Sequence, residues 1–177
     1  RVIASICEEV RAVGASLTVA IVPFVLFDAA ERPGWGRLFG PSRPLPATRV
    51  NAMLYSTLIE GYSRGVLRRA DALALLSEGC RAAVRRFGDR AAVSLGAVGS
   101  GALGDEPVYE DPAELSVDVA VAEACGVRDL WLFDLGGVLA RGAPESWLEA
   151  FVAPGARAPT AGPTARARVV SALREAG

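Results

Sequence analysis

Acidic residues follow several apolar segments of the sequence, and their side chains are the ones best suited to chemistry. Asp28 and Asp134 each follow an apolar segment, and Glu106 lies in the Gly-rich connection after a third. Paired carboxylates can protonate a leaving group, activate water or stabilise charge, as in glycosidases. The same oxygens also suit a hard cation such as Mg²⁺. We take Asp28, Glu106 and Asp134 as candidate catalytic residues, and each also has a structural interpretation as a turn, capping or solvated residue.

Candidate substrate-binding residues lie near the same positions. Tyr55 ends the second apolar segment, Glu60 follows it, and Tyr109 lies in the connection that holds Glu106. Trp35 stands between two glycines in a long Pro- and Gly-rich connection, where an aromatic ring suits stacking on a sugar. Core packing on a buried strand is the alternative interpretation for Tyr55, and a solvated position is the alternative for Glu60.

The composition excludes several kinds of site. The 177 residues include no histidine, and lysine is also absent, so a Ser-His-Asp triad, a Cys-His pair and a His-ligated metal are excluded from this stretch. The three cysteines lie far apart, without Cys-x-x-Cys spacing, which favours buried apolar side chains over a metal site. We predict no metal and no cofactor. The net charge of −1 gives no electrostatic basis for binding nucleic acid or an anionic membrane.

Apolar segments alternate with helical patterns along the chain. Strands are predicted at 17–22, 50–55, 91–98 and 130–133, with helices before, between and after them. This alternation predicts a parallel sheet, and a spacing of roughly 35 to 45 residues per unit suits a barrel better than a doubly wound open sheet. The predicted fold class is therefore α/β, with parallel β/α units that form about half of a (β/α)8 TIM barrel.

The partial barrel is predicted to cover residues 1–152. Residues 153–177 are rich in Ala, Pro, Gly and Arg, which predicts a loose tail with a short helix near 169–173. Because four strands cannot close a barrel, the missing half is expected either upstream of Arg1 or in a second copy of the chain. The apolar run 17–27 is too short to span a membrane, so a soluble chain is expected, with a cytoplasmic location slightly favoured.

Two glycine-rich stretches suggest other interpretations. Gly99, Gly101 and Gly104 have G-x-G-x-x-G spacing, but the next helix begins too late to place a phosphate on its N-terminus, which favours a wide loop. The stretch 133–139, Phe-Asp-Leu-Gly-Gly-Val-Leu, resembles the first motif of haloacid dehalogenase-like phosphatases, in which a strand-end Asp is the nucleophile. Gly136 stands where that family has a second aspartate. We keep this phosphatase as a minor alternative.

A second resemblance involves three of the predicted strands. The stretch 51–55, Asn-Ala-Met-Leu-Tyr, resembles the end of the sixth strand in family 18 glycoside hydrolases, and 93–96, Val-Ser-Leu-Gly, is similar to their seventh. The last predicted unit, a helix followed by Gly126-Val and an apolar-aromatic strand, resembles their eighth. The resemblance implies the C-terminal half of a chitinase-like barrel that hydrolyses a β-linked amino sugar polymer.

The same resemblance implies roles for individual residues. Tyr55 would hold the acetamido group of the sugar, and Phe133 would occupy the aromatic position below the sugar site. Ser56 stands where the family has Asp, and Phe133 stands where it has Trp. The family's acid-bearing motif belongs to its fourth strand, so the resemblance places the general acid outside this stretch.

Three hypotheses for function follow. The first is a glycosidase-like hydrolase that acts on or binds carbohydrate, and it predicts that Asp28, Tyr55, Glu106 and Asp134 converge at one mouth. The second is a non-catalytic barrel that binds a small-molecule or oligosaccharide ligand or serves as a scaffold, favoured if apolar side chains fill that mouth. The third is the phosphatase, which requires an open sheet and a Mg²⁺ pocket around Asp134.

Overall fold

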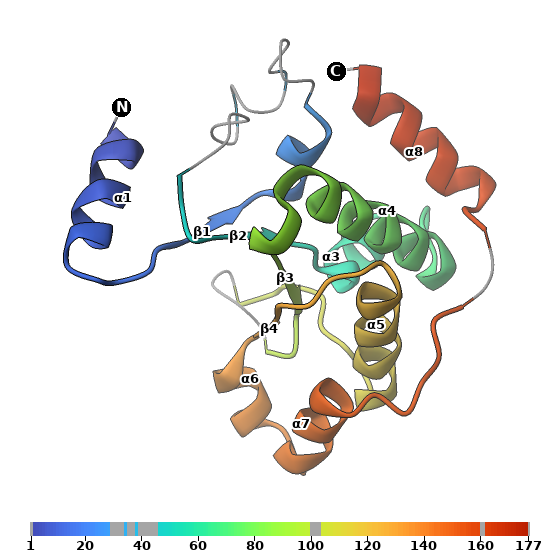
Figure 1. The fold of residues 1–177 in the computed structure, drawn as a ribbon. Coiled ribbons are helices and arrows are strands. Elements are labelled where there is room, and N and C mark those ends of the chain that lie inside the picture. The colour runs from blue at the N-terminus through green and yellow to red at the C-terminus, as the bar shows by residue number, and fades with distance from the viewer. Residues whose placement is uncertain are drawn as a thin grey trace.

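Four short parallel strands form the centre of the computed structural model, which describes residues 2–28, 34, 38, 46–99, 104–159 and 162–176. The sheet has the order β1-β2-β3-β4, so each strand lies beside its neighbour in the sequence (Figure 1). This confirms the predicted α/β class with parallel β/α units, and the order is the one that successive units of a barrel have. The strands are β1 (Thr18–Ile21), β2 (Arg49–Met53), β3 (Ala91–Gly96) and β4 (Leu130–Phe133).

Helices precede, connect and follow the strands. Helix α5 illustrates how local sequence sets a boundary, because Asp111 accepts a hydrogen bond from the backbone of Ala113 and Pro112 occupies the first helical position. The α-helices are α1 (Val2–Ala12), α3 (Ser56–Tyr62), α4 (Arg69–Phe87), α5 (Pro112–Ala124), α6 (Leu135–Ala140), α7 (Pro144–Val152) and α8 (Ala165–Ala176), and the 3-10 helices are η1 (Pro23–Phe27) and η2 (Gly88–Arg90).

The two faces of the sheet differ in character. One face contributes Val50, Val93 and Leu95 to the apolar core, and α4 and α5 contact β3. Residues that alternate with these point to the opposite face, because successive side chains of a strand alternate. The opposite face includes the buried pair Asn51 and Ser94, joined by a 2.8 Å hydrogen bond, and Trp131, which is 44% exposed. In a closed barrel, this second face would line the interior.

A buried polar cluster joins three helices on the side of the sheet that α4 and α5 cover. Asp118 of α5 is fully buried and accepts hydrogen bonds from the hydroxyls of Ser56 and Tyr109. Arg69, at the start of α4, donates to the Asp118 carboxylate at 2.7 Å and to Ser56 at 2.9 Å. Burial raises the pKa of Asp118, and the arginine and the hydroxyl donors oppose that effect. The cluster fastens α3, α4 and α5 to one another.

The C-terminal stretch is more ordered than the sequence predicts. The helix expected near 169–173 extends over the whole of α8 and contacts α4. Thr164 donates a hydrogen bond to Asp71 of α4, and Ser171 donates to Glu78 of the same helix. Residues 165–176 therefore form a helix packed against α4, where the sequence predicts a loose tail with a short helix near 169–173.

The described helices also bear on the membrane question. None of them, within residues 2–28, 46–99, 104–159 and 162–176, combines the length and the apolar composition needed to cross a membrane.

Candidate functional site

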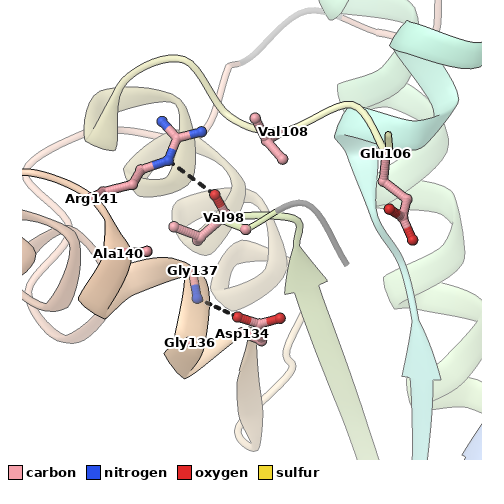
Figure 2. Close-up of a pocket in the computed structure, with 9 residues that line it drawn as sticks. Val98, Glu106, Val108, Asp134, Gly136, Gly137, Ala140 and Arg141 are labelled. Atoms are coloured by element: carbon pink, nitrogen blue, oxygen red, sulfur yellow. Dashed lines mark hydrogen bonds between the residues drawn. The ribbon is translucent and has the colours of Figure 1, made fainter. Parts of the chain in front are cut away.

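Asp134 lies where β4 ends and α6 begins. Its carboxylate accepts a hydrogen bond from the backbone of Gly137, which fixes its orientation at the start of the helix. The side chain lines an open pocket of about 460 Å³ beside the carboxyl ends of β3 and β4. Figure 2 shows Asp134, Glu106 and Arg141 reaching this pocket from different sides. The other lining residues are Val98, Gly99, Val108, Gly136, Gly137 and Ala140.

Two glycines allow one wall of this pocket to form. A Cβ atom added to Gly137 would lie 2.2 Å from the backbone nitrogen of Gly99, and one added to Gly99 would lie 2.6 Å from the Cα of Gly137. No side chain fits between these two backbone segments. The glycines therefore bring the start of α6 against the chain that leaves β3, and this contact places Asp134 beside that connection.

Glu106 reaches the pocket from the connection between β3 and α5. The next residue, Pro107, packs so closely on α3 that a Cβ atom added to Gly61 would lie 2.3 Å from its ring. Tyr109 fixes the same segment, because its backbone donates to Ala97 and its hydroxyl donates to Asp118. A 2.9 Å hydrogen bond from the Gly104 backbone to Oε2 orients the Glu106 carboxylate.

An aromatic pair adjoins Asp134. The rings of Tyr55 and Phe133 are stacked, with centroids 5.3 Å apart and planes inclined by 21°. Burial raises the pKa of the half-buried Tyr55 hydroxyl, and the nearby Asp134 raises that pKa further, whereas a hydrogen bond with Ser94 lowers it. Tyr55 therefore remains protonated at neutral pH and can donate a hydrogen bond to a ligand.

Arg141 also lines this pocket, although it was not among the site residues predicted from the sequence. Its Nε donates a 3.0 Å hydrogen bond to the backbone oxygen of Val98, and its guanidinium lies 4.9 Å from the centroid of the Trp147 ring. A signal was available, because Arg141 is the first basic residue after the fourth predicted strand. Basic residues in the connections that follow parallel strands can reach the ligand-binding edge of the sheet.

Asp28 does not join the pocket. Its side chain is largely buried, and its backbone oxygen accepts a 3.0 Å hydrogen bond from Arg86. Arg86 lies in the last turn of α4, which leads through η2 into the start of β3. The start of β3 is the opposite end of the strand from the pocket, which lies beside the carboxyl ends of β3 and β4. The expected convergence is thus seen for Glu106 and Asp134 in the pocket and for Tyr55 beside it, whereas Asp28 lies elsewhere.

The other predicted substrate-binding residues have separate positions. The Tyr109 ring is completely buried and its hydroxyl is bonded to Asp118, so this residue holds the connection in place and does not line the pocket. Glu60 lies on α3, partly exposed, and is not among the pocket residues. Trp35 lies outside the described residues.

The pocket combines groups for acid–base chemistry with a fixed cation. Two carboxylates and one guanidinium line the pocket, and glycine backbone forms part of its wall. In the part of the chain that the structure describes, no cluster of three or more His, Cys, Asp or Glu side chains could hold a metal ion. The order of β1 to β4 also contains no reversal, which is where doubly wound sheets bind their ligands. The phosphatase alternative, which rests on Asp134 at the end of β4, stays a prediction.

Comparisons with known proteins leave the function to be argued from this geometry. The chain matches no protein-family model, no curated protein and no solved structure. Because one fold can host many functions, the function is inferred from the residues of the pocket.

Proposed function

We propose that this chain is half of a carbohydrate-active barrel and that its pocket binds and hydrolyses a glycoside. One observation carries this proposal: Glu106 and Asp134, from different connections, line the same pocket beside the ends of two parallel strands. Glycosidases use two carboxylates on either side of the scissile bond, one as proton donor and one as nucleophile or base. Glu106 and Asp134 would supply that pair.

The aromatic pair supports a sugar as the ligand. Tyr55 stacks on Phe133 beside Asp134 and keeps its proton, so it can donate to an oxygen of a sugar substituent. Phe133 adds an apolar ring surface of the kind on which the faces of sugar rings pack. The role of Tyr55 agrees with the resemblance to family 18 glycoside hydrolases, where the tyrosine holds an acetamido group, whereas the pair Glu106 and Asp134 is proposed independently of that resemblance.

Closure of the barrel requires four further strands. Within the described sheet, β1 and β4 each pair with a single strand and leave one edge open. A (β/α)8 barrel would use both edges and cover the face that carries Trp131. Those strands would come from a further part of the protein or from a second copy of the chain.

A non-catalytic carbohydrate-binding protein is the second candidate. Val98, Val108 and Ala140 also line the pocket, and apolar lining suits binding without chemistry. The two candidates share the pocket and differ in whether its carboxylates take part in a reaction.

Binding and hydrolysis measured together test both candidates. The chain is probed on an oligosaccharide array, and bound sugars are then assayed for release of reducing ends. We expect Glu106→Gln and Asp134→Asn each to lower hydrolysis at least about 100-fold while binding is retained. Glu110→Gln is the matched control, because Glu110 is exposed on the same connection but does not line the pocket.

Each outcome has a distinct meaning. Binding with no hydrolysis by the unmodified chain would favour the non-catalytic candidate. Hydrolysis that Glu106→Gln and Glu110→Gln reduce equally would contradict a catalytic role for Glu106. A chain that binds no oligosaccharide would overturn the proposal.

A further inference from the structure

Arg141 is fixed at the pocket by its Nε and by its stacking on Trp147, and its two terminal amino groups face no acceptor among the described residues. Its Nε is bonded to the Val98 backbone, and its guanidinium lies over Trp147, which is 2% exposed and therefore fixed in the core. Among the described residues, no protein atom accepts a hydrogen bond from either terminal amino group of Arg141. The side chain is thus oriented before a ligand arrives, and its remaining donors are available.

The carboxylates of the pocket do not neutralise this arginine. The ion pairs within the described part of the chain join Arg49 to Asp129, Arg69 to Asp118 and Arg166 to Asp71. Neither Glu106 nor Asp134 forms an ion pair with Arg141, although all three line the same pocket. Arg141 and Glu106 lie on different sides of the pocket (Figure 2), so a cation and a carboxylate line separate parts of it.

We infer that the sugar bound in this pocket carries a carboxylate, as a uronic acid does, and that Arg141 binds it; this inference rests on the proposed function. The planar guanidinium can donate two parallel hydrogen bonds to a carboxylate, which matches its spacing. Because the Arg141 side chain is already fixed, little of its conformational freedom is lost on binding.

The separation of charge also orients the ligand. Glu106 and Asp134 repel an anionic group, whereas Arg141 attracts it. A uronic acid unit would therefore bind with its carboxylate at Arg141. Its glycosidic bond would then lie toward the two carboxylates of the pocket. A neutral sugar lacks the group that distinguishes Arg141 from the carboxylates.

The test compares matched sugars. Oligogalacturonides, their methyl esters, neutral galacto-oligosaccharides and sulfated galacto-oligosaccharides are titrated against the chain, alongside oligosaccharides that contain glucuronate or mannuronate. We expect at least one carboxylated series to bind about 10- to 100-fold more tightly than its neutral counterpart, which is the typical effect of charged hydrogen bonds. The methyl esters keep the shape of the sugar and remove its charge, so they are expected to bind like the neutral sugars.

Variants of Arg141 assign the preference to this residue. Arg141→Gln is expected to reduce the preference for the carboxylate to within about twofold, whereas Arg141→Lys keeps the charge without the planar fork and is expected to retain an intermediate preference. Arg128→Gln is the control, because Arg128 is exposed and does not line the pocket. Circular dichroism confirms folding, and the lysine variant remains informative if the glutamine variant does not fold.

The outcomes separate this inference from the proposed function. Equal binding of neutral and carboxylated sugars, or a preference that survives Arg141→Gln, would overturn the role of Arg141 while leaving a carbohydrate-binding pocket. Tighter binding of sulfated sugars would overturn the carboxylate as the recognised group. Failure of every sugar to bind would overturn both proposals.

Discussion

The buried carboxylate of Asp118 links several elements of the fold through hydrogen bonds. Three side chains from α3, α4 and the β3–α5 connection donate hydrogen bonds to it, and it has no exposed surface. A buried charge of this kind is tolerated only when partners compensate for its lost hydration. The cluster is therefore sensitive to the loss of any one member.

We predict that Asp118→Asn lowers the free energy of unfolding by about 3 kcal/mol, because it leaves Arg69 without its buried counter-ion. Asp129→Asn is the matched control, because its ion pair with Arg49 is exposed, and about 1 kcal/mol or less is expected. Urea unfolding followed by circular dichroism measures both. Equal losses in the two variants would contradict a special role for the buried carboxylate.

Two tyrosines make stability depend on alkaline pH. Burial raises the pKa of Tyr109 well above its ordinary value, and burial also raises that of Tyr55. In the unfolded chain both ionise near pH 10, whereas the folded chain keeps their protons. Their contribution to stability is therefore complete below about pH 10 and is lost as the pH rises through the raised folded values.

Tyrosinate absorbance of the folded chain measures this effect directly. We expect ionisation of these two tyrosines to be delayed beyond about pH 10 and to be completed only with unfolding. Tyr109→Phe and Tyr55→Phe should each remove part of the alkaline loss of stability. Full ionisation of the folded chain near pH 10 would show that the hydroxyls are solvated.

At the scale of residues, the sequence predicts which side chains lie at the ends of strands better than it predicts their hydrogen-bond partners. Glu106 and Asp134 could be identified because chain order alone places them after parallel strands. The roles of Arg141 and Asp118 depend on hydrogen-bond partners that lie 43 and 62 positions away, the backbone oxygen of Val98 and the side chain of Ser56. Such pairings arise only from the packing of separate elements, although an aspartate within the apolar face of α5 was a sign of a buried partner.

Helix α6 is the element that most directly shapes the pocket. It has six residues, and Gly136 and Gly137 give it a low intrinsic tendency to be helical. Its contact with Gly99 and its cap at Asp134 stabilise it, so a pattern of residues alone does not reveal it. The same reasoning applies to α8, because Ser171 within it and Thr164 just before it are hydrogen-bonded to α4.

We predict that Gly137→Ala destabilises the fold by about 1–3 kcal/mol, because its Cβ atom would overlap the backbone at Gly99. Gly136→Ala is the control in the same helix, where the added atom would meet only Asp134 Oδ1, at 3.4 Å. This control is expected to be neutral or slightly stabilising, since alanine favours helix. Thermal unfolding of the two variants distinguishes the close contact from a general effect of glycine.

On the scale of the whole molecule, the sheet is covered unequally. Helices α4 and α5 contact β3 from the side of the apolar core, whereas Trp131 on the other face is 44% exposed. Period-two alternation could predict which residues share a face, but which elements cover each face depends on tertiary contacts. The sequential strand order agrees with the predicted half barrel, whose second half remains a prediction.

Tryptophan fluorescence tests whether the face of the sheet that carries Trp131 is exposed. In the Trp35→Phe variant, we expect acrylamide to quench Trp131 readily and to leave Trp147, which is 2% exposed, largely protected. Trp131→Phe should therefore abolish most of the quenching. Protection of Trp131 in the isolated chain at high concentration would indicate that a second copy covers this face, whereas strong quenching of Trp147 would contradict the packing of α7.

The anchoring of Tyr109 has a thermodynamic consequence for recognition. Its buried ring and its bonds to Ala97 and Asp118 hold the segment that carries Glu106, and Pro107 is fixed against Gly61. A ligand therefore meets a carboxylate that is already in position, and association does not require that stretch of chain to lose conformational entropy. Selectivity at this end of the pocket then depends on whether the ligand fits a preorganised shape.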